Sequence, residues 1–319
     1  MSDSQNRNED WDRQVLEKLV FSTLHEQRRT RQWGVFFKSL TFIWLFILLF
    51  FGLGWFGDSS MSISGKHTAL VDLRGVISPD TISSAENITA GLQQAFKDAK
   101  TQGVILRINS PGGSPVQAGY INDEIRRLRA EHPEIPLYAV VEDICASGGY
   151  YVAVAADKIY VDKASIIGSI GVLMNGFGFT KAMEKLGIER RLITAGENKA
   201  FLDPFSPNNH EQEEYAKKML GDIHEQFIQV VQQGRGERLK ERPEIFSGKV
   251  WTGQKSVELG LADGMGSAEY VAREIIKAEY IVDYTTREGV AERLAKRFGG
   301  VLAETLSGLG MSTGSIGIR

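Results

Sequence analysis

Ser147 stands between two stretches of different pattern. Residues 137–141 are apolar and strand-like, and the small residues of 150–156 are typical of a packed helix. Gly148 and Gly149 follow the serine directly, and glycines let a chain turn sharply and bring backbone N–H groups close to a substrate. A helix beginning here would point unpaired N–H groups at a developing negative charge. The pattern predicts either a serine nucleophile beside an oxyanion hole or an ordinary helix N-cap.

Two more glycine-rich turns could take part in the same chemistry. Residues 106–115 read as a strand that ends in a turn containing Gly112 and Gly113. Paired glycines after a strand expose N–H groups that can clamp a peptide or hold an oxyanion, although an ordinary tight turn gives the same pattern. Ser169 lies between two glycines in 167–172. Its hydroxyl could support a catalytic lysine or simply satisfy a turn.

A serine nucleophile needs a base that accepts its proton. The five histidines are scattered and form no HExxH pair, so we expect neither a histidine base nor a metal site. A lysine can act as the base where burial lowers its pKa, because desolvation disfavours the ammonium form. Lys199 lies in the segment 196–205 among apolar residues that could exclude water. A solvated loop lysine is the alternative interpretation.

Composition limits the remaining possibilities. The chain has 319 residues, 42% of them hydrophobic and 24% charged, which suits one large or two ordinary domains with a substantial core. The formal net charge of −3 gives no sign of a nucleic-acid partner. Cys145 is the single cysteine, which excludes an intrachain disulfide and a cysteine-based zinc site.

The N-terminal part of the chain has the pattern of a membrane anchor. Residues 39–57 carry no charge, and about 20 apolar residues cross a bilayer as a helix. Basic residues precede this stretch and Asp58 follows it, so the positive-inside rule places 1–38 in the cytoplasm and the rest on the other side. The long lead and the lack of an Ala-x-Ala site predict a retained signal-anchor rather than a cleaved signal peptide.

Beyond a Ser/Gly linker at 58–66, strand-like and helix-like segments alternate, which predicts a mostly parallel sheet covered by helices. Both glycine turns then fall at the carboxyl ends of strands, where such sheets hold their chemistry. The apolar face of 209–233 is predicted to join the core. Strands are predicted at 68–77, 103–108, 137–141, 158–161, 190–194 and 280–284, and helices at 10–31, 84–100, 116–130, 150–156, 209–233, within 251–266, at 268–278 and at 290–306.

Together these motifs resemble the bacterial signal peptide peptidase family, which consists of membrane-anchored Ser-Lys proteases related in fold to the Clp proteases and the crotonases. The resemblance covers residues 66–285, and the single N-terminal anchor matches the short form of the family. The similar stretches occur in the family's order, with similar intervals, at 109–113, 145–151, 167–172 and 196–204.

The resemblance implies an α/β fold of repeated ββα units, a mostly parallel sheet flanked by helices, and one N-terminal transmembrane helix. It implies that Ser147 is the nucleophile, that Lys199 is the general base and that Ser169 orients the lysine. The chain would then divide into a cytoplasmic segment, 1–38, the anchor, 39–57, the linker, 58–66, a protease domain, 67–285, and a C-terminal helix and tail, 286–319.

The resemblance also implies that the N–H of Gly148 forms the oxyanion hole with that of Gly113, with Gly112 as the alternative to Gly113. It implies no metal and no cofactor. The expected partners are released signal peptides and other short peptides, a bacterial inner membrane with the catalytic domain on its extracytoplasmic side, and further copies of the chain. In the family's rings the two halves of the dyad can come from adjacent subunits, so Ser147 and Lys199 need not meet within one chain.

Two other functions fit the same fold. One is an acyl-CoA-processing enzyme whose glycine turns hold a thioester oxyanion, but an external domain argues against it because CoA is cytosolic. The other is a non-catalytic membrane scaffold.

Overall fold

The computed structural model describes residues 28–29, 31–49, 65–240 and 242–286. The described residues from 65 to 286 belong to one compact unit, separate from the helix before it. The helix predicted at 290–306, most of the helix predicted at 10–31 and most of the linker lie outside the described residues.

The helix Arg31–Leu49 is the one described helix that is long and apolar enough to cross a membrane. Its 19 residues span about 28 Å, close to the thickness of a hydrocarbon core. None of it is buried, and Trp33 stacks on Phe37 near its N-terminal end with ring centroids 5.8 Å apart. The helix begins eight residues before the apolar stretch predicted at 39–57. The absence of charge shows where the apolar stretch begins, but a helix can begin earlier, among charged residues.

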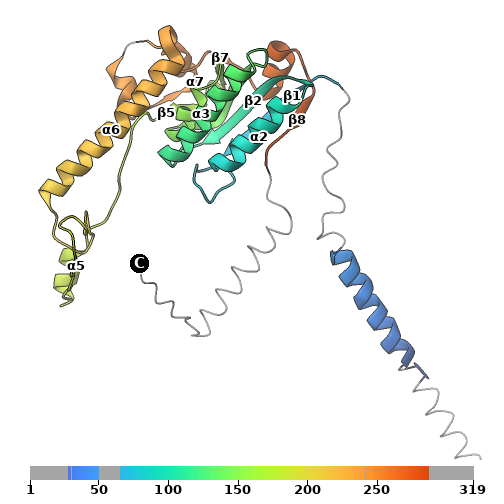
Figure 1. Cartoon of the computed structure of the whole chain (residues 1–319), viewed down its shortest axis with the longest axis horizontal. Coiled ribbons are helices and arrows are strands. Elements are labelled where there is room, and N and C mark those ends of the chain that lie inside the picture. The colour runs from blue at the N-terminus through green and yellow to red at the C-terminus, as the bar shows by residue number, and fades with distance from the viewer. Residues whose placement is uncertain (1–27, 30, 50–64, 241, 287–319) are drawn as a thin grey trace, which may run out of the picture. The chain divides into compact units, whose positions relative to one another are not determined.

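In the described part of residues 63–287, eight strands form one sheet (Figure 1) in the order β6-β5-β3-β2-β1-β8, with β4 paired to β3 and β7 paired to β4. Every pair is parallel except β5 with β6. The mostly parallel sheet confirms the predicted α/β class. The strands are β1 His67–Arg74, β2 Thr101–Ser110, β3 Leu137–Ala146, β4 Lys158–Val161, β5 Ile166–Gly168, β6 Val250–Thr252, β7 Gly264–Met265 and β8 Ile281–Asp283.

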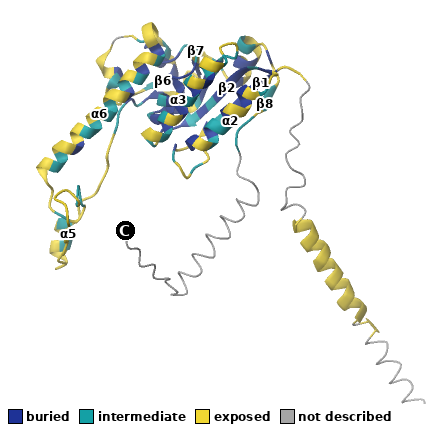
Figure 2. Cartoon of the chain, viewed as in Figure 1, coloured by how far each residue is buried: buried dark blue, intermediate teal, exposed yellow. Residues whose placement is uncertain are grey.

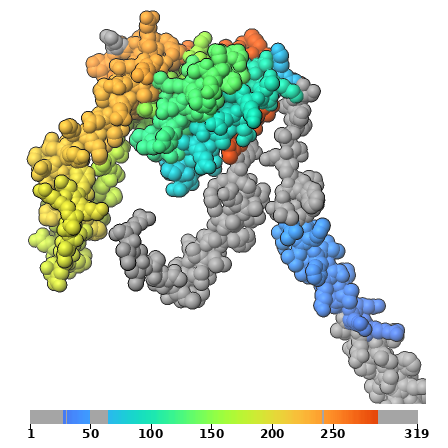
Figure 3. Space-filling model, viewed as in Figure 1, coloured from blue at the N-terminus to red at the C-terminus, as the bar shows by residue number. Residues whose placement is uncertain are grey.

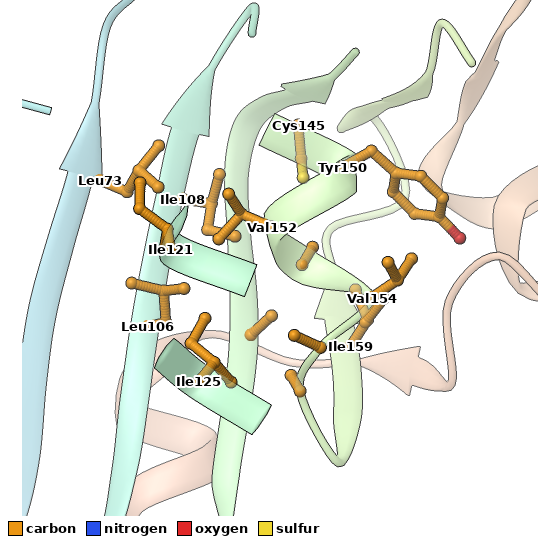
Figure 4. Packing of buried hydrophobic residues seen from close by; sticks show 14 of the residues in the cluster. Leu73, Leu106, Ile108, Ile121, Ile125, Cys145, Tyr150, Val152, Val154 and Ile159 are labelled. Carbon is orange, nitrogen blue, oxygen red and sulfur yellow. The ribbon is translucent and has the colours of Figure 1, made fainter. Parts of the chain in front are cut away.

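Helices cover one face of this sheet and build the larger core (Figure 2). In Figure 4, Leu106 and Ile108 of β2 face Ile121 and Ile125 of the helix beside them, and all four are fully buried. Each such side chain contributes about 1.5–3 kcal/mol through burial. The helices are α2 Ala85–Lys97, α3 Pro115–Glu131, α4 Gly148–Ala153, α5 Thr180–Lys185, α6 His210–Arg235, α7 Gly253–Glu258 and α8 Ala268–Tyr270, with shorter turns η1 Gly236–Arg238, η2 Pro243–Phe246 and the π-helical η3 Val271–Ile276.

Strand β3 divides the sheet into two branches. It pairs with β4 over Tyr138–Val140 and with β5 over Ile144–Ala146. Residues 141–143 pair with neither of these strands, so the sheet forks at this point. The face of the sheet opposite α2–α4 carries a smaller cluster in which α8 and η3 cover Leu70, Ile105 and Val140.

One prediction along the chain is wrong, and another holds only in part. Residues 190–194 form no strand in the structure and are exposed, because a run with β-propensity still needs a neighbouring strand to pair with. The apolar face predicted at 209–233 joins the core only at its C-terminal end. Phe227 and Val231 of α6 are buried, whereas Tyr215 is 64% exposed.

A buried ion pair closes the end of the core beside α6. Arg235 is 1% exposed, and its Nη1 lies 2.8 Å from Oδ2 of Asp263. Burial raises the pKa of Asp263, whereas the hydrogen bond and the charge of Arg235 lower it. The lowering outweighs the effect of burial, so the pKa of Asp263 lies below its ordinary value. The carboxylate's stabilising effect is therefore complete above about pH 4 and is lost as the pH falls through the folded-state pKa.

Replacing Asp263 by alanine is expected to lower the free energy of unfolding at pH 7 by about 3–5 kcal/mol, because the Arg235 charge stays buried without its partner. Urea unfolding from pH 3 to 7 measures this loss, which should shrink toward pH 3. The exposed Glu134→Gln variant is the control. A loss below about 1 kcal/mol at pH 7 would show that the pair is not a stabilising one.

Candidate active site

Ser147 has an unusual backbone at the junction of β3 and α4. Its φ of 52° and ψ of −124° fall in a region that residues other than glycine seldom occupy. Its N–H donates a hydrogen bond to the carbonyl oxygen of Gly168 at 2.8 Å, and its side chain makes no capping bond to α4. The side chain is half-buried. The strand-to-helix turn thus holds the hydroxyl in a strained, accessible position, as a nucleophile elbow does.

The two glycines that open α4 have close neighbours. A Cβ on Gly148 would lie 3.2 Å from the nitrogen of Gly113, and a Cβ on Gly149 would lie 3.1 Å from the carbonyl oxygen of Ser110. The start of α4 therefore packs directly against the loop that follows β2. The structure brings the two glycine turns together, as the resemblance implies.

Hydrogen bonds of the loop after β2 distinguish Gly112 from Gly113. The N–H of Gly112 donates to Oγ of Ser110 at 3.1 Å, and its carbonyl accepts from the N–H of Ile77 at 2.9 Å. Gly113 forms a parallel bridge with Ile77 in which the N–H of Ser114, and not that of Gly113, is the donor. Within the described residues the N–H of Gly113 has no hydrogen-bond partner, and Gly113 is exposed while Gly112 is buried. The open donor is that of Gly113.

Ser110 positions this loop, and we did not single it out from the sequence. Its hydroxyl donates to the carbonyl of Gly75 at 2.6 Å and accepts from the N–H of Gly112. Its side chain is completely buried. The sequence places this serine at the end of an apolar, buried strand. A hydroxyl buried there must find a hydrogen-bond partner, and this could have indicated its role.

Ser169 lies beside the nucleophile turn. The pairing of Ala146 with Gly168 places the end of β5 next to Ser147. Ser169 has a φ of 53°, and its N–H donates to the carbonyl of Lys249 at 2.8 Å. This turn holds the half-buried Ser169 directly after Gly168, whose carbonyl accepts from the N–H of Ser147.

Lys199 belongs to a segment that gathers around the N-terminal end of α6 (Figure 3). Phe201 packs its ring on Tyr215 with centroids 5.8 Å apart, and the N–H of Leu202 donates to Oε1 of Gln212 at 3.0 Å. Lys199 is exposed, and its ammonium makes no ion pair within the described part of the chain.

The helix of Ser147 contacts α6 at a different point. Tyr151 packs on Phe227 with ring centroids 5.1 Å apart, and Nε2 of His224 lies 3.1 Å from the carbonyl oxygen of Ile170. Phe227 lies twelve residues beyond Tyr215, which is about 18 Å along the axis of a helix. A single chain therefore docks the segment of Lys199 and the helix of Ser147 at separate points of α6. No hydrogen bond joins Ser147 to Lys199 within the described residues.

Cys145 is close to Ser147 in sequence but is not placed for chemistry. Its side chain points into the core beside Tyr150 (Figure 4) and is fully buried. Burial raises the pKa of its thiol above the ordinary value. A buried, protonated thiol is inert as a nucleophile.

Known proteins resemble this chain over its α/β part. Two proteins, of Brucella melitensis and Brucella abortus, both named Na(+)/H(+) antiporter NhaA, are 42% identical over 229 residues. The match covers 72% of this chain, which spans only 30% of the length of those relatives. A Methanocaldococcus jannaschii protein named as a candidate protease is 31% identical, with 70% of this chain and 75% of that protein covered. An Enterococcus faecium protein named as a candidate signal peptide peptidase is 28% identical, with 70% and 67% covered.

Residues 129–281 match the model of peptidase family S49. The match includes Ser147, Ser169 and Lys199 and begins after Gly113. The mostly parallel, helix-flanked sheet agrees with the Clp protease-like fold of that family. With the similarity to the M. jannaschii protein over three quarters of its length, these findings show that the chain belongs to peptidase family S49.

Proposed function

We propose that this chain is a membrane-anchored serine endopeptidase in which Ser147 attacks the peptide bond. The observation that carries the proposal is Ser147, whose backbone is strained and whose side chain makes no capping bond, beside two N–H groups, those of Gly148 and Gly113, that lack partners in the described structure. Fixed donors at such a place hold the oxyanion of acyl transfer, and each contributes about 3–4 kcal/mol to lowering the barrier.

In the mechanism, the uncharged amine of Lys199 takes the hydroxyl proton of Ser147 while Oγ bonds to the peptide carbonyl carbon. The carbonyl oxygen becomes an oxyanion that accepts hydrogen bonds from Gly148 and Gly113. The lysine then gives its proton to the leaving amine, and the C–N bond breaks. A water, deprotonated by the same amine, hydrolyses the acyl ester and restores Ser147. Ser169 would hydrogen-bond the amine and fix its direction.

The lysine that acts on Ser147 comes, in this proposal, from a neighbouring copy in a homo-oligomeric ring. The supporting observation is that one chain docks the two segments about 18 Å apart along α6. The segment around Lys199 also exposes large apolar side chains that a partner subunit would cover. An interface would supply the desolvation that keeps an amine uncharged. The exposed apolar side chains include Leu173, Phe177, Leu186 and Ile193, with exposed fractions of 81%, 75%, 73% and 96%.

The N-terminal helix and the basic residues before it favour a single-pass anchor in a bacterial inner membrane, with 1–38 in the cytoplasm and the protease domain, 67–285, on the extracytoplasmic side. Peptides would bind in extended form along strand edges near the site. Tethering at the membrane suits released signal peptides and other short or unfolded peptides as substrates.

A fluorophosphonate probe tests the proposal, because it modifies only an activated serine. The expected result is modification of Ser147 in the full-length chain, with Ser110 and Ser169 unmodified, as peptide mapping by mass spectrometry would show. A non-catalytic scaffold would give no modification. An acyl-CoA enzyme would turn over thioesters without cleaving peptides.

Replacing Gly113 by alanine is expected to lower kcat for peptide cleavage about 10²- to 10³-fold, because the open N–H donor is displaced. A Cβ there would meet the carbonyl oxygen of Ile77 at 2.1 Å, at a φ of 151°. Gly119→Ala is the matched control, because a Cβ there meets nothing within 4 Å. Steady-state kinetics with thermal unfolding on both variants measures this. Unchanged kcat in a folded Gly113→Ala protein would remove Gly113 from the oxyanion hole.

A further inference from the structure

The fork of the sheet at β3 opens a cavity that the proposed mechanism does not use. Its volume is about 710 Å³. It lies beside residues 141–143 of β3, between the part of β3 that pairs with β4 and the part that pairs with β5. Its walls come from the ends of β1, β2 and β4, the start of β5 and the turn from β7 into α8. This is the carboxyl side of a mostly parallel sheet, where such folds bind their ligands.

The arginines that line the cavity are already neutralised. Arg107 bonds Asp72 through Nε at 2.5 Å and Nη2 at 2.7 Å, and Arg74 bonds Glu142 at 2.9 Å. These four charged groups cancel one another across three neighbouring strands. An anion entering the cavity would have to break one of these pairs, so we do not expect the arginines to bind an anionic ligand.

Three further carboxylates give the cavity an excess of negative charge. Asp143 accepts a hydrogen bond from Asn109 at 2.7 Å, and Asp162 accepts one from the N–H of Ala164 at 2.9 Å. Neither these two nor Glu269 forms an ion pair within the described residues, and all three are exposed. The charge of Arg107 acts on Glu269, but a cationic group would still find three carboxylates here that form no ion pair.

Apolar side chains line the same cavity beside these carboxylates. Ile166 and Met265 are 42% and 43% exposed, although both are large and apolar. Val140, Val141 and Val161 form a buried floor beneath them. The lining therefore suits a cationic side chain that is followed by an apolar one.

We propose that this cavity binds a lysine or arginine side chain, with the apolar residue beside it, in the peptide being cleaved. The inference rests on the proposed peptidase function. Asp143 of β3 lies four residues before Ser147, which is about 13 Å of extended chain. An extended peptide would reach the cavity with a residue about four positions from the scissile bond. Signal peptides have this composition, a positively charged region followed by an apolar run.

Two peptides of equal length and identical apolar run test the site, one with lysine four residues from the cleaved bond and one with norleucine there. Full-length protein carrying both Asp162→Asn and Glu269→Gln is compared with wild type. We expect KM for the lysine peptide to rise about fivefold in the double variant, with kcat unchanged and the norleucine peptide unaffected. Glu134→Gln, on the loop before β3, should change neither peptide.

Binding is measured separately by fluorescence anisotropy on Ser147→Ala protein with the same peptides. If wild type cleaves neither peptide, the proposed peptidase function fails while anisotropy still decides the cavity. Equal affinity for the two peptides, or an equal change for both in the double variant, would overturn the inference. So would a double variant whose oligomeric state changes in sedimentation while the lysine preference stays, because the cavity would then be covered by a second copy of the chain.

Discussion

Replacing Ser147 by alanine is expected to lower kcat for peptide cleavage by about 10⁵- to 10⁶-fold, because no other group can form the acyl-enzyme. The fold should be retained, since the hydroxyl makes no capping bond and the side chain is only half-buried. The residual rate would come from the oxyanion donors and substrate binding. Active-site titration and single-turnover assays on purified full-length protein measure the loss.

Ser147→Gly separates the backbone strain from the chemistry. Glycine adopts a φ of 52° without the steric cost that serine carries. This variant should be as inactive as Ser147→Ala and more stable than wild type by about 1 kcal/mol. Substantial cleavage by either variant would mean that another residue is the nucleophile.

Replacing Lys199 by alanine is expected to lower kcat by about 10⁴-fold or more at neutral pH, because the hydroxyl of Ser147 loses its proton acceptor. Lys199→Arg should be equally inactive, although it keeps the charge and much of the volume, because a guanidinium cannot be deprotonated in a protein. Lys158→Ala is the control, an exposed lysine at the start of β4.

The pH profile adds a second readout of the base. In wild type the rate should rise with pH, because only an uncharged amine can accept the hydroxyl proton of Ser147. The alanine variant should lose this rise. A Lys199→Ala protein that keeps the full rate at neutral pH would contradict the assignment of the base.

The sequence was sufficient for the elements whose patterns run unbroken. Strands β1 and β2 and helices α2 and α3 lie within a few residues of their predicted bounds, because each buries a periodic apolar face. Strand β3 runs five residues beyond its predicted end at 141. Short β6 and β7 were not predicted, since two or three residues carry no period. The 190–194 segment has the residue types of a strand, but nothing in its own pattern shows whether a neighbouring strand is available.

Some of the site residues could likewise be predicted from the sequence, and others could not. The turns at Ser147 and Ser169 could be found from their glycines, and the structure brings them together through the pairing of β3 with β5. The choice between Gly113 and Gly112 could not be made from the sequence, because it depends on Ile77, which is distant along the chain. The position of Lys199 also depends on which part of α6 packs on the core. The apolar residues of α6 continue along its whole length, so the sequence does not show which part is buried.

Mixing two inactive proteins tests most directly whether Lys199 of one copy activates Ser147 of another. Ser147→Ala and Lys199→Ala chains are unfolded together, mixed in equal amounts and reassembled in detergent, and cleavage is compared with wild type treated identically. If each site takes its serine and its lysine from neighbouring copies, about a quarter of the sites in a randomly mixed ring are intact, so about a quarter of the wild-type rate should return. A mixture as inactive as its two components would contradict a shared dyad.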